Sequence, residues 1–520
     1  MSHPSTGLRK ASSKVRQACD RCHSRKIRCD GRRPCIKCQE TEAECTFYAV
    51  PKKTGPKGPR HTRKLHHRQQ PVPSSSYQRD GASPEREGYR FENIAQARTD
   101  GSPPRDTAHD SNGFRPAVQV STDILQWCLN AFFKHKYPIT PILCRPQMEE
   151  CLQEFPTSPE KYGLLMACCA VIALSPEIFP PSAHHQINLP KADFFLSETL
   201  RSRRYHNFVD NLSLTHAQTS FFLFAAFFCI DNDNAAWFYL RESITILQTL
   251  RLHEEATYND INDTVLVTYA RRMFWVLFIT ERAYALQRNR PLTLQSTLNL
   301  PNADPLSSDA EILPGFLDLI SLFRPFDTEF ISTWNSSIPS ASPTAAEPGE
   351  LARLQNTLKH ALPSVSNYSE TQQADLLISR QWLKVIVWKL CVSKTLLSGT
   401  NSDDSMSLSY PSTIARDVVL ITRRLPTKAL EANGIGILEK VFDIGCSLAD
   451  LLSLSPASTF WSAMDVGPID ILMETVKIVG RTFGGTYRHL DILVDKANYS
   501  LLMNVDRSLP LPVDVSLEEL

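Results

Sequence analysis

Six cysteines gathered in one short segment constrain this chain more than any other feature of its sequence. They form two nearly identical halves, in which a Cys-x2-Cys pair is separated by six residues from a third cysteine. The segment reads Cys19-x2-Cys22-x6-Cys29-x5-Cys35-x2-Cys38-x6-Cys45. A segment this short cannot fold on a hydrophobic core, so its cysteines must supply the stability.

Metal coordination accounts for this spacing. A Cys-x2-Cys pair places two thiolates on one ion, and a cysteine that follows a short helix can return to the same ion. Zinc prefers four ligands in a tetrahedron, so six thiolates satisfy two ions only when two of them bridge both ions. The symmetry of the halves predicts that the bridges are Cys19 and Cys35. The remaining ligands are then Cys22 and Cys29 on one ion, and Cys38 and Cys45 on the other. An iron–sulfur site or a generic metal sink fits the regular spacing and the many basic neighbours less well, and an intracellular context disfavours a disulfide knot.

Charge is distributed unevenly along the 520 residues. Residues 1–68 hold 18 Lys or Arg against 5 Asp or Glu, a balance of +13, whereas the rest holds 38 against 50, a balance of −12. A basic head on an acidic body indicates that the head meets a polyanion and the body does not.

The sequence outside the cluster indicates in which cellular compartment the protein resides. The other eight cysteines lie scattered in apolar segments, where a reduced cysteine behaves as a small hydrophobic residue. The opening MSHPSTGLRKASSKVRQ lacks the apolar core of a secretory signal. The longest apolar runs, 164–174 and 221–230, are shorter than the roughly 20 residues that cross a bilayer. We therefore expect a soluble, intracellular protein without a membrane partner.

Composition divides the chain into five expected parts. They are a disordered basic arm at 1–17, a zinc-cluster domain at 18–48, a basic and then Ser/Pro-rich disordered linker at 49–118, an all-α body at 119–500, and an acidic-hydrophobic tail at 501–520. The linker is poor in aliphatic residues, so it cannot bury enough apolar surface to offset the ordering of its backbone. The tail is typical of disordered activation segments, and equally of a frayed terminus.

Helical periodicity dominates the body, and strand alternation bounded by turns is almost absent. The predicted helices cover 122–137, 160–174, 191–205, 213–230, 234–250, 263–287, 371–397, 410–425, 429–452 and 470–484. The predicted fold is therefore a small binuclear zinc-cluster domain, with two short helices around two zinc ions, joined by a disordered linker to a large all-α regulatory domain.

The residues 23–28, His-Ser-Arg-Lys-Ile-Arg, are predicted to form a short helix whose inner face is held on the metal. Its basic side chains then point outward, and Arg25 and Lys26 can enter a major groove and donate to guanine O6 and N7. Arg32 and Arg33 fit solvated charges as well as they fit DNA contacts. Phosphate contacts are expected from Arg21, Arg28 and Lys37.

A basic, proline-broken stretch follows the cluster. Such a run is typical of a nuclear import signal and of an anchor on the DNA backbone, so we expect a nuclear protein. Its basic residues are Lys52, Lys53, Lys57, Arg60, Arg63 and Lys64.

Residues 18–47, ACDRCHSRKIRCDGRRPCIKCQETEAECTF, resemble the fungal Zn2Cys6 binuclear cluster transcription factors. The likeness includes Asp20, Asp30, the loop residue Pro34 and Phe47 after the last cysteine. It implies two zinc ions, recognition of CGG-type triplets with Lys26 as the chief base reader, and RNA polymerase II promoters as targets. One departure is His23, which stands where the family often has an arginine that touches phosphate.

The body is similar to the middle-homology regulatory region of the same family. CLNAFFKHKYPITPILCRP at 128–146 and ARRMFWVLFITERAYALQRNRPLTL at 270–294 carry this likeness, which implies a helical bundle without catalytic residues. Many members follow the cluster with a heptad coiled coil. Here prolines at 51, 56, 59, 71 and 73 interrupt that place, so the oligomeric state stays open between a monomer and a dimer formed through the body.

Two functions from different classes fit these observations. The first is a sequence-specific transcription factor for a fungal metabolic gene set, either nutrient use or a secondary-metabolite cluster, with double-stranded DNA and the transcription machinery or co-regulators as partners. The second is a zinc-dependent interaction module that binds RNA or protein without DNA sequence specificity. A third possibility adds a small metabolite bound inside the helical body. No phosphate loop, nucleophile elbow or dinucleotide fingerprint occurs in the sequence, so no enzyme is expected.

Overall fold

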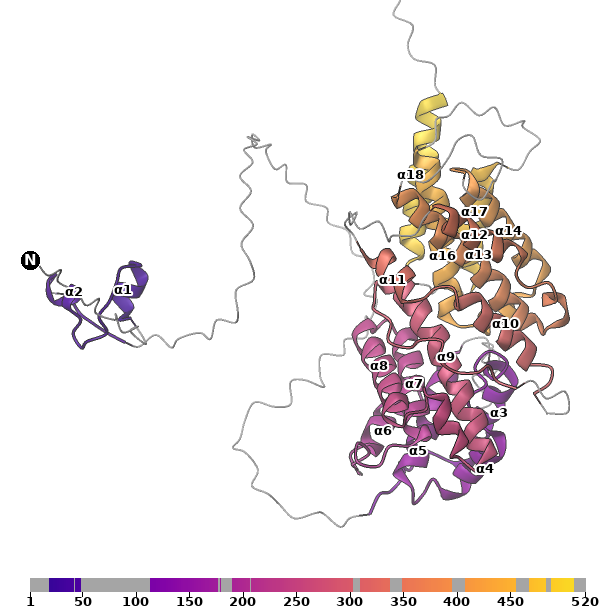
Figure 1. Cartoon of the computed structure of the whole chain (residues 1–520), viewed down its shortest axis with the longest axis horizontal. Helices are drawn as coiled ribbons and strands as arrows, with labels where there is room; N and C mark the ends of the chain where they lie inside the picture. Colours follow the sequence, from indigo (N-terminus) through magenta and orange to yellow (C-terminus); the bar gives the residue numbers. More distant parts are fainter. Residues whose placement is uncertain are drawn as a thin grey trace, which may run out of the picture. The chain divides into compact units, whose positions relative to one another are not determined.

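The computed structural model describes residues 18–41, 43–47, 113–175, 178, 189–205, 207–302, 309–336, 348–394, 407–454, 467–482 and 488–508. The basic arm, the import segment, most of the linker and the tail after residue 508 lie outside these residues. The chain divides into two units, Met1–Arg105 with the cysteine cluster and Asp106–Leu520 with the helical body (Figure 1).

The cysteine-rich unit is built on two short helices, α1 (Asp20–Ser24) and α2 (Ile36–Gln39). Cys19 and Cys35, the first cysteines of the two halves, stand at the N-caps with extended backbone. The Cys19 sulfur also accepts a hydrogen bond from the first turn of α1. The repeated sequence therefore gives a repeated local structure, in which each half begins its helix at a cysteine.

The two ends of this unit are tied to each other. The Asp20 N–H donates to the Thr46 carbonyl at 2.8 Å, and the Thr46 hydroxyl donates to the Asp20 carboxylate at 2.8 Å. The buried core of the unit consists of cysteines alone, with Ala18, Phe47 and the half-buried Cys45 against it. No ordinary hydrophobic core supports these described residues, as the length of the segment predicted.

The first half of the body is a layered set of helices in which α5, α6, α7 and α8 pack on one another. Polar residues fix the helix starts, because Ser121, Ser158, Ser213, Asn232 and Asp263 accept N–H groups of the first turns. The elements are α3 (Thr122–Ala131), a π-helical turn (Phe132–Lys136), α4 (Arg145–Glu154), α5 (Pro159–Ala173), α6 (Ala192–Ser202), α7 (Leu214–Cys229), α8 (Asp233–Thr249), a 3-10 turn (Glu255–Asn259) and α9 (Thr264–Arg288).

The second half is organised around α13 and α16, which contact each other. Both helices also contact α14, and α16 contacts α17 and α18 as well. Trp382 of α13 is fully buried, and its indole N–H donates to Asp443 of α16 at 2.9 Å. The elements are α10 (Leu313–Phe323), α11 (Thr328–Asn335), α12 (Pro348–His360), a 3-10 turn (Val365–Asn367), α13 (Glu370–Ser393), α14 (Tyr410–Arg424), α15 (Thr427–Glu431), α16 (Ile435–Leu454), α17 (Pro468–Arg481) and α18 (Leu490–Ser508).

Polar contacts join the two halves of the body. Lys136 donates to the carbonyl of Ala432 at 2.9 Å, across 296 positions of sequence. Glu439 of α16 accepts from Arg288 of α9 at 3.2 Å and from Arg488 at 2.9 Å. Because these groups are mostly buried, the contacts fix how the halves pack.

The all-α prediction is confirmed, since the described residues contain no strand. Two predicted helices differ from the structure. The helix predicted at 122–137 gives way to the π-helical turn, and the helix predicted at 429–452 is split at Gly434, whose φ is +72°. Among the described residues, no helix combines the length and the apolar character needed to cross a bilayer.

The ends of the body also differ from the expected boundaries. Phe114, placed by the sequence in the linker, packs on the body with its ring 5.2 Å from that of Tyr162. At the other end, α18 continues to Ser508, beyond residue 500 where the tail was expected to begin. The body therefore begins before residue 119, and its last helix ends after residue 500.

Candidate metal centre and nucleic-acid interface

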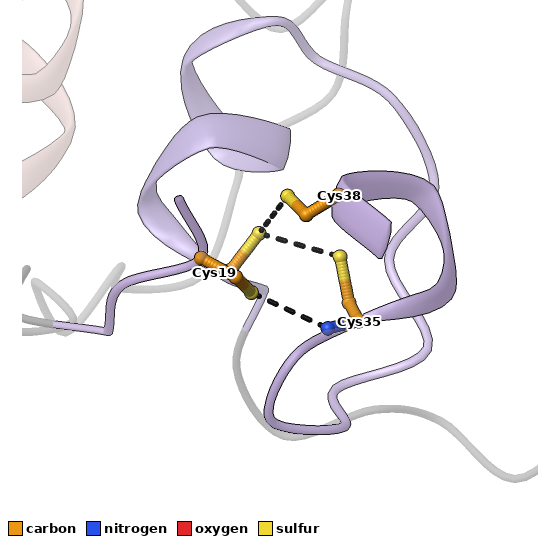
Figure 2. Close-up of side chains that lie close together, drawn as sticks. Cys19, Cys35 and Cys38 are labelled. Carbon is orange, nitrogen blue, oxygen red and sulfur yellow. Dashed lines mark hydrogen bonds between the residues drawn. The ribbon is translucent and has the colours of Figure 1, made fainter. Parts of the chain in front are cut away.

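The sulfurs of Cys19, Cys35 and Cys38 face one another inside the small unit (Figure 2). The Cys19 sulfur lies 3.7 Å from that of Cys35 and 3.6 Å from that of Cys38, and the sulfurs of Cys22 and Cys35 are 3.6 Å apart. A tetrahedral zinc ion with Zn–S bonds of about 2.3 Å holds its sulfurs about 3.8 Å apart. The thiols are all free rather than paired in disulfides, so the donor set fits zinc in both chemistry and spacing.

The six cysteines form two sets of four whose sulfurs lie within 4.8 Å of one another. One set is Cys19, Cys22, Cys29 and Cys35, and the other is Cys19, Cys35, Cys38 and Cys45. Cys19 and Cys35 belong to both sets, which is the division expected from the symmetry of the sequence halves. Each set has the ligand number that a structural zinc ion requires.

Backbone N–H groups point at the sulfurs and prepare them to carry negative charge. The Cys35 N–H donates to the sulfur of Cys45 at 3.3 Å, and the N–H groups of Cys19 and Gly31 donate to the sulfur of Cys29 at 3.5 and 3.4 Å. The sulfur of Cys19 accepts from the Cys22 N–H at 3.4 Å. Hydrogen bonds to an ionised group favour the ionised form, so these donors stabilise thiolates.

The thiol pKa values separate the shared cysteines from their neighbours. Burial opposes ionisation at Cys19 and Cys35, but hydrogen bonds, led by those of the Cys22 and Cys38 backbone, leave the pKa of both below the usual value. At Cys22 and Cys38 burial prevails and raises the pKa, that of Cys38 to about 12. The two cysteines common to both sets are therefore easier to ionise than these neighbours.

The basic segment between the second and third cysteines is exposed from His23 to Arg28. The sequence predicted a helix here, and this prediction is wrong, because α1 already ends at Ser24. Lys26 has a φ of +54°, and the chain then turns back so that Cys29 reaches the other sulfurs. The return to the sulfur cluster outweighs the helix propensity of the segment.

Two backbone hydrogen bonds hold this turn. The Lys26 N–H donates to the His23 carbonyl at 3.2 Å, and the Ile27 N–H donates to the Cys22 carbonyl at 3.1 Å. This pair is a Schellman motif, in which glycine usually occupies the left-handed position. A lysine in that conformation costs roughly 1–2 kcal/mol, which points to a use for its side chain.

The other predicted DNA contacts lie in different surroundings. Arg25 is exposed and follows α1, Arg28 is exposed beside Cys29, and Arg21 is half-buried on α1. The ammonium of Lys37 on α2 donates a hydrogen bond to the Glu40 carboxylate at 2.9 Å, and this bond raises the pKa of Lys37. A phosphate that meets Lys37 must therefore compete with a carboxylate on the same helix.

Sequence reasoning did not foresee how the surrounding residues brace the cluster. The carboxylate of Asp30 accepts from the Ile36 N–H at 3.3 Å, which links the two halves at the start of α2. The guanidinium of Arg33 lies over the Phe47 ring at 4.7 Å from its centre, in a cation–π contact. Asp30 and Phe47 are both part of the resemblance noted in the sequence, which was the available signal for these roles.

Comparison with known protein families now gives the class of this chain. Residues 17–55 match the fungal Zn(2)-Cys(6) binuclear cluster domain, and residues 129–386 match the fungal specific transcription factor domain. A thiolate cluster with a basic surface, carried with this helical domain, defines a zinc-dependent DNA-binding regulator and not an enzyme. The chain belongs to the fungal Zn2Cys6 transcription factors, and its cluster domain binds two zinc ions.

Relatives with this arrangement are similar along most of the chain. The chain is 26% identical over 446 residues to a probable sucrose utilization protein of Candida albicans. The aligned region covers 84% of this chain and 79% of that protein. It is 23% identical over 443 residues to a maltose fermentation regulatory protein of Saccharomyces cerevisiae, and this alignment covers 84% of each protein. A respiratory transcription factor of the same yeast is 22% identical over 442 residues, covering 84% of this chain and 85% of its own. No solved structure matches the chain.

Proposed function

We propose that this protein is a pathway-specific regulator that reads CGG-type triplets at RNA polymerase II promoters of a fungal nutrient-use gene set. The observation that carries the proposal is the exposed basic segment from His23 to Arg28, which is anchored to the sulfur cluster at both ends. A rigid, positively charged edge of this kind suits entry into a major groove.

In this proposal the six cysteines have distinct roles. Cys19 and Cys35 bridge the two zinc ions, because they are common to both sets of four sulfurs. Cys22 and Cys29 complete one ion, and Cys38 and Cys45 complete the other. The zinc ions supply the folding energy of the unit and thereby fix the basic segment in one conformation.

The base-reading role falls first on Lys26. Its backbone is held in a turn by two hydrogen bonds, so its ammonium group projects from a fixed point of the surface. Guanine offers O6 and N7 as acceptors in the major groove, and Arg25 beside it can donate to the same edge. The phosphate contacts assigned to Arg21, Arg28 and Lys37 set the register on the duplex.

The target gene set is proposed from the relatives. The names of two of them refer to sucrose utilization and maltose fermentation, and both are similar over 84% of this chain. We therefore place carbohydrate use ahead of a secondary-metabolite cluster. The basic residues from Lys52 to Lys64 are assigned to nuclear import, and the helical body to contacts with co-regulators.

The test is selection from a randomised duplex pool by the full-length, zinc-loaded protein, with zinc content determined on the same sample. We expect two zinc ions per chain and enrichment of a CGG-type triplet. A duplex with the same base composition in shuffled order, measured at the same salt concentration, controls for phosphate attraction. Two zinc ions with equal binding to both duplexes would overturn sequence-specific recognition and favour the zinc-dependent interaction module.

A further inference from the structure

A cavity of about 380 Å³ lies inside the helical body and is walled by both of its halves. The walls are chiefly apolar and aromatic, and include Phe221, Phe224 and Phe228 of α7 and Phe316 and Phe323 of α10. Small-molecule sites commonly have volumes of about 300–1,000 Å³ and apolar linings. Water alone would fill this space with roughly a dozen molecules, given about 30 Å³ each, mostly against apolar walls.

One part of the lining is charged. Lys136, Asp375 and Lys440 are the charged residues among those that line the cavity, which gives a net formal charge of +1. The ammonium of Lys440 on α16 donates to the Ser379 hydroxyl at 2.6 Å and to the Asp375 carboxylate at 3.3 Å. Lys136 is only 8% exposed, and its ammonium donates to the Ala432 carbonyl at 2.9 Å.

The backbone beside these lysines leaves room for a ligand. Gly434 and Gly436 both line the cavity where α16 begins, and a Cβ atom added at either glycine would meet no atom within 4 Å. The start of a helix carries partial positive charge, so it adds to the charge of the two lysines. An anionic group near the two lysines would balance the lining, and an apolar body would occupy the rest of the cavity against the aromatic side chains.

We infer that this cavity binds a small organic acid, a molecule with an aromatic or aliphatic body and a single anionic group. The anion lies near Lys136 and Lys440, and the body lies among the phenylalanines of α7 and α10. A ligand seated there contacts both halves of the body and stabilises their packing. This inference does not depend on which DNA sequence the protein reads.

The test uses two dyes that share one aromatic body. Anilinonaphthalene sulfonate carries a single negative charge, whereas phenylnaphthylamine is uncharged. Fluorescence titration of the full-length protein should give one saturable site per chain for the anionic dye, at least tenfold tighter than for the uncharged dye. The anionic dye should also raise the melting temperature of the body, because it binds only the folded state.

Two variants with matched controls locate the site. Ala225→Phe on α7 places a ring in the cavity and should reduce dye affinity at least tenfold, whereas Val392→Phe on the exposed surface of α13 should not. Lys136→Met should weaken the anionic dye alone, whereas Lys428→Met, at an exposed position on α15, should change neither dye. Equal affinities of the two dyes, or unchanged binding to Ala225→Phe, would overturn the inference. If Lys136→Met does not fold, the comparison of the two dyes and Ala225→Phe still decide it.

Discussion

Replacing Lys26 tests whether its side chain or its backbone conformation serves DNA recognition. In Lys26→Ala the ammonium is lost and the strained φ of +54° remains, whereas in Lys26→Gly both the ammonium and the strain are removed. A specific base contact is worth about 1–3 kcal/mol, so both variants should bind a CGG-type duplex roughly 5- to 150-fold more weakly. Lys26→Gly should also hold its turn about 1 kcal/mol more stably than Lys26→Ala.

The assay is fluorescence anisotropy with the selected duplex and a shuffled duplex at one salt concentration, using zinc-loaded full-length protein. Cluster stability is followed on the same samples as the rate of zinc loss to a chelator, which should be slower for Lys26→Gly than for Lys26→Ala. Equal weakening of both duplexes would show that Lys26 contacts phosphate. Recovery of specific affinity in Lys26→Gly would show that the turn matters and the ammonium does not, which would refute the base-reading role.

Further predictions concern the cluster and the body. Cys19→Ser should lose both zinc ions in native mass spectrometry, because Cys19 belongs to both sulfur sets, whereas Cys45→Ser should keep one; two ions retained in Cys19→Ser would exclude bridging. Hydrogen bonding from Arg271 lowers the pKa of Glu255 from 4.5 to about 2, so the stability it gives is present above about pH 4.5 and is lost as the pH falls toward 2. The melting temperature of Glu255→Gln should therefore fall less steeply over that range, and an unchanged slope would contradict this contribution. Glu281 is fully buried and accepts hydrogen bonds from the 293–294 backbone and an arginine of α8, so Glu281→Ala should cost about 3–5 kcal/mol in urea unfolding; a loss below 1 kcal/mol would show that the site relaxes.

The cluster was predictable because metal coordination depends on the spacing of cysteines that lie close together in the sequence. Two thiolates in one turn and a third after a short stretch specify a metal set without any long-range information, and the shared positions follow from symmetry. The turn at Lys26 was not predictable in the same way. Nothing in residues 23–28 opposes a helix locally, and α1 ends early because Cys29 must return to sulfurs supplied by residues further along the chain.

The body shows the same division between local and distant causes. Long helices that begin at a capping residue were predicted close to their observed limits, as for α7 and α9. The helix α10 was missed because no side chain caps its start and Pro314 and Gly315 stand in its first turn, and α4 because it is short and largely polar. The cavity could not be predicted, since its walls come from helices in both halves of the body, and its charged residues run from Lys136 to Lys440.

The contact between Lys136 and Ala432 also bears on how the chain is made. At about 5–20 residues per second, the ribosome needs roughly 15–60 s to pass from one partner to the other, because 296 positions separate them. During that interval the phenylalanine-rich surface of α7 has been synthesised, but α16 has not. The body can close only after α16 has been synthesised, so a message truncated at residue 386, where the match to the regulatory domain ends, would yield a chain whose apolar interior stays uncovered.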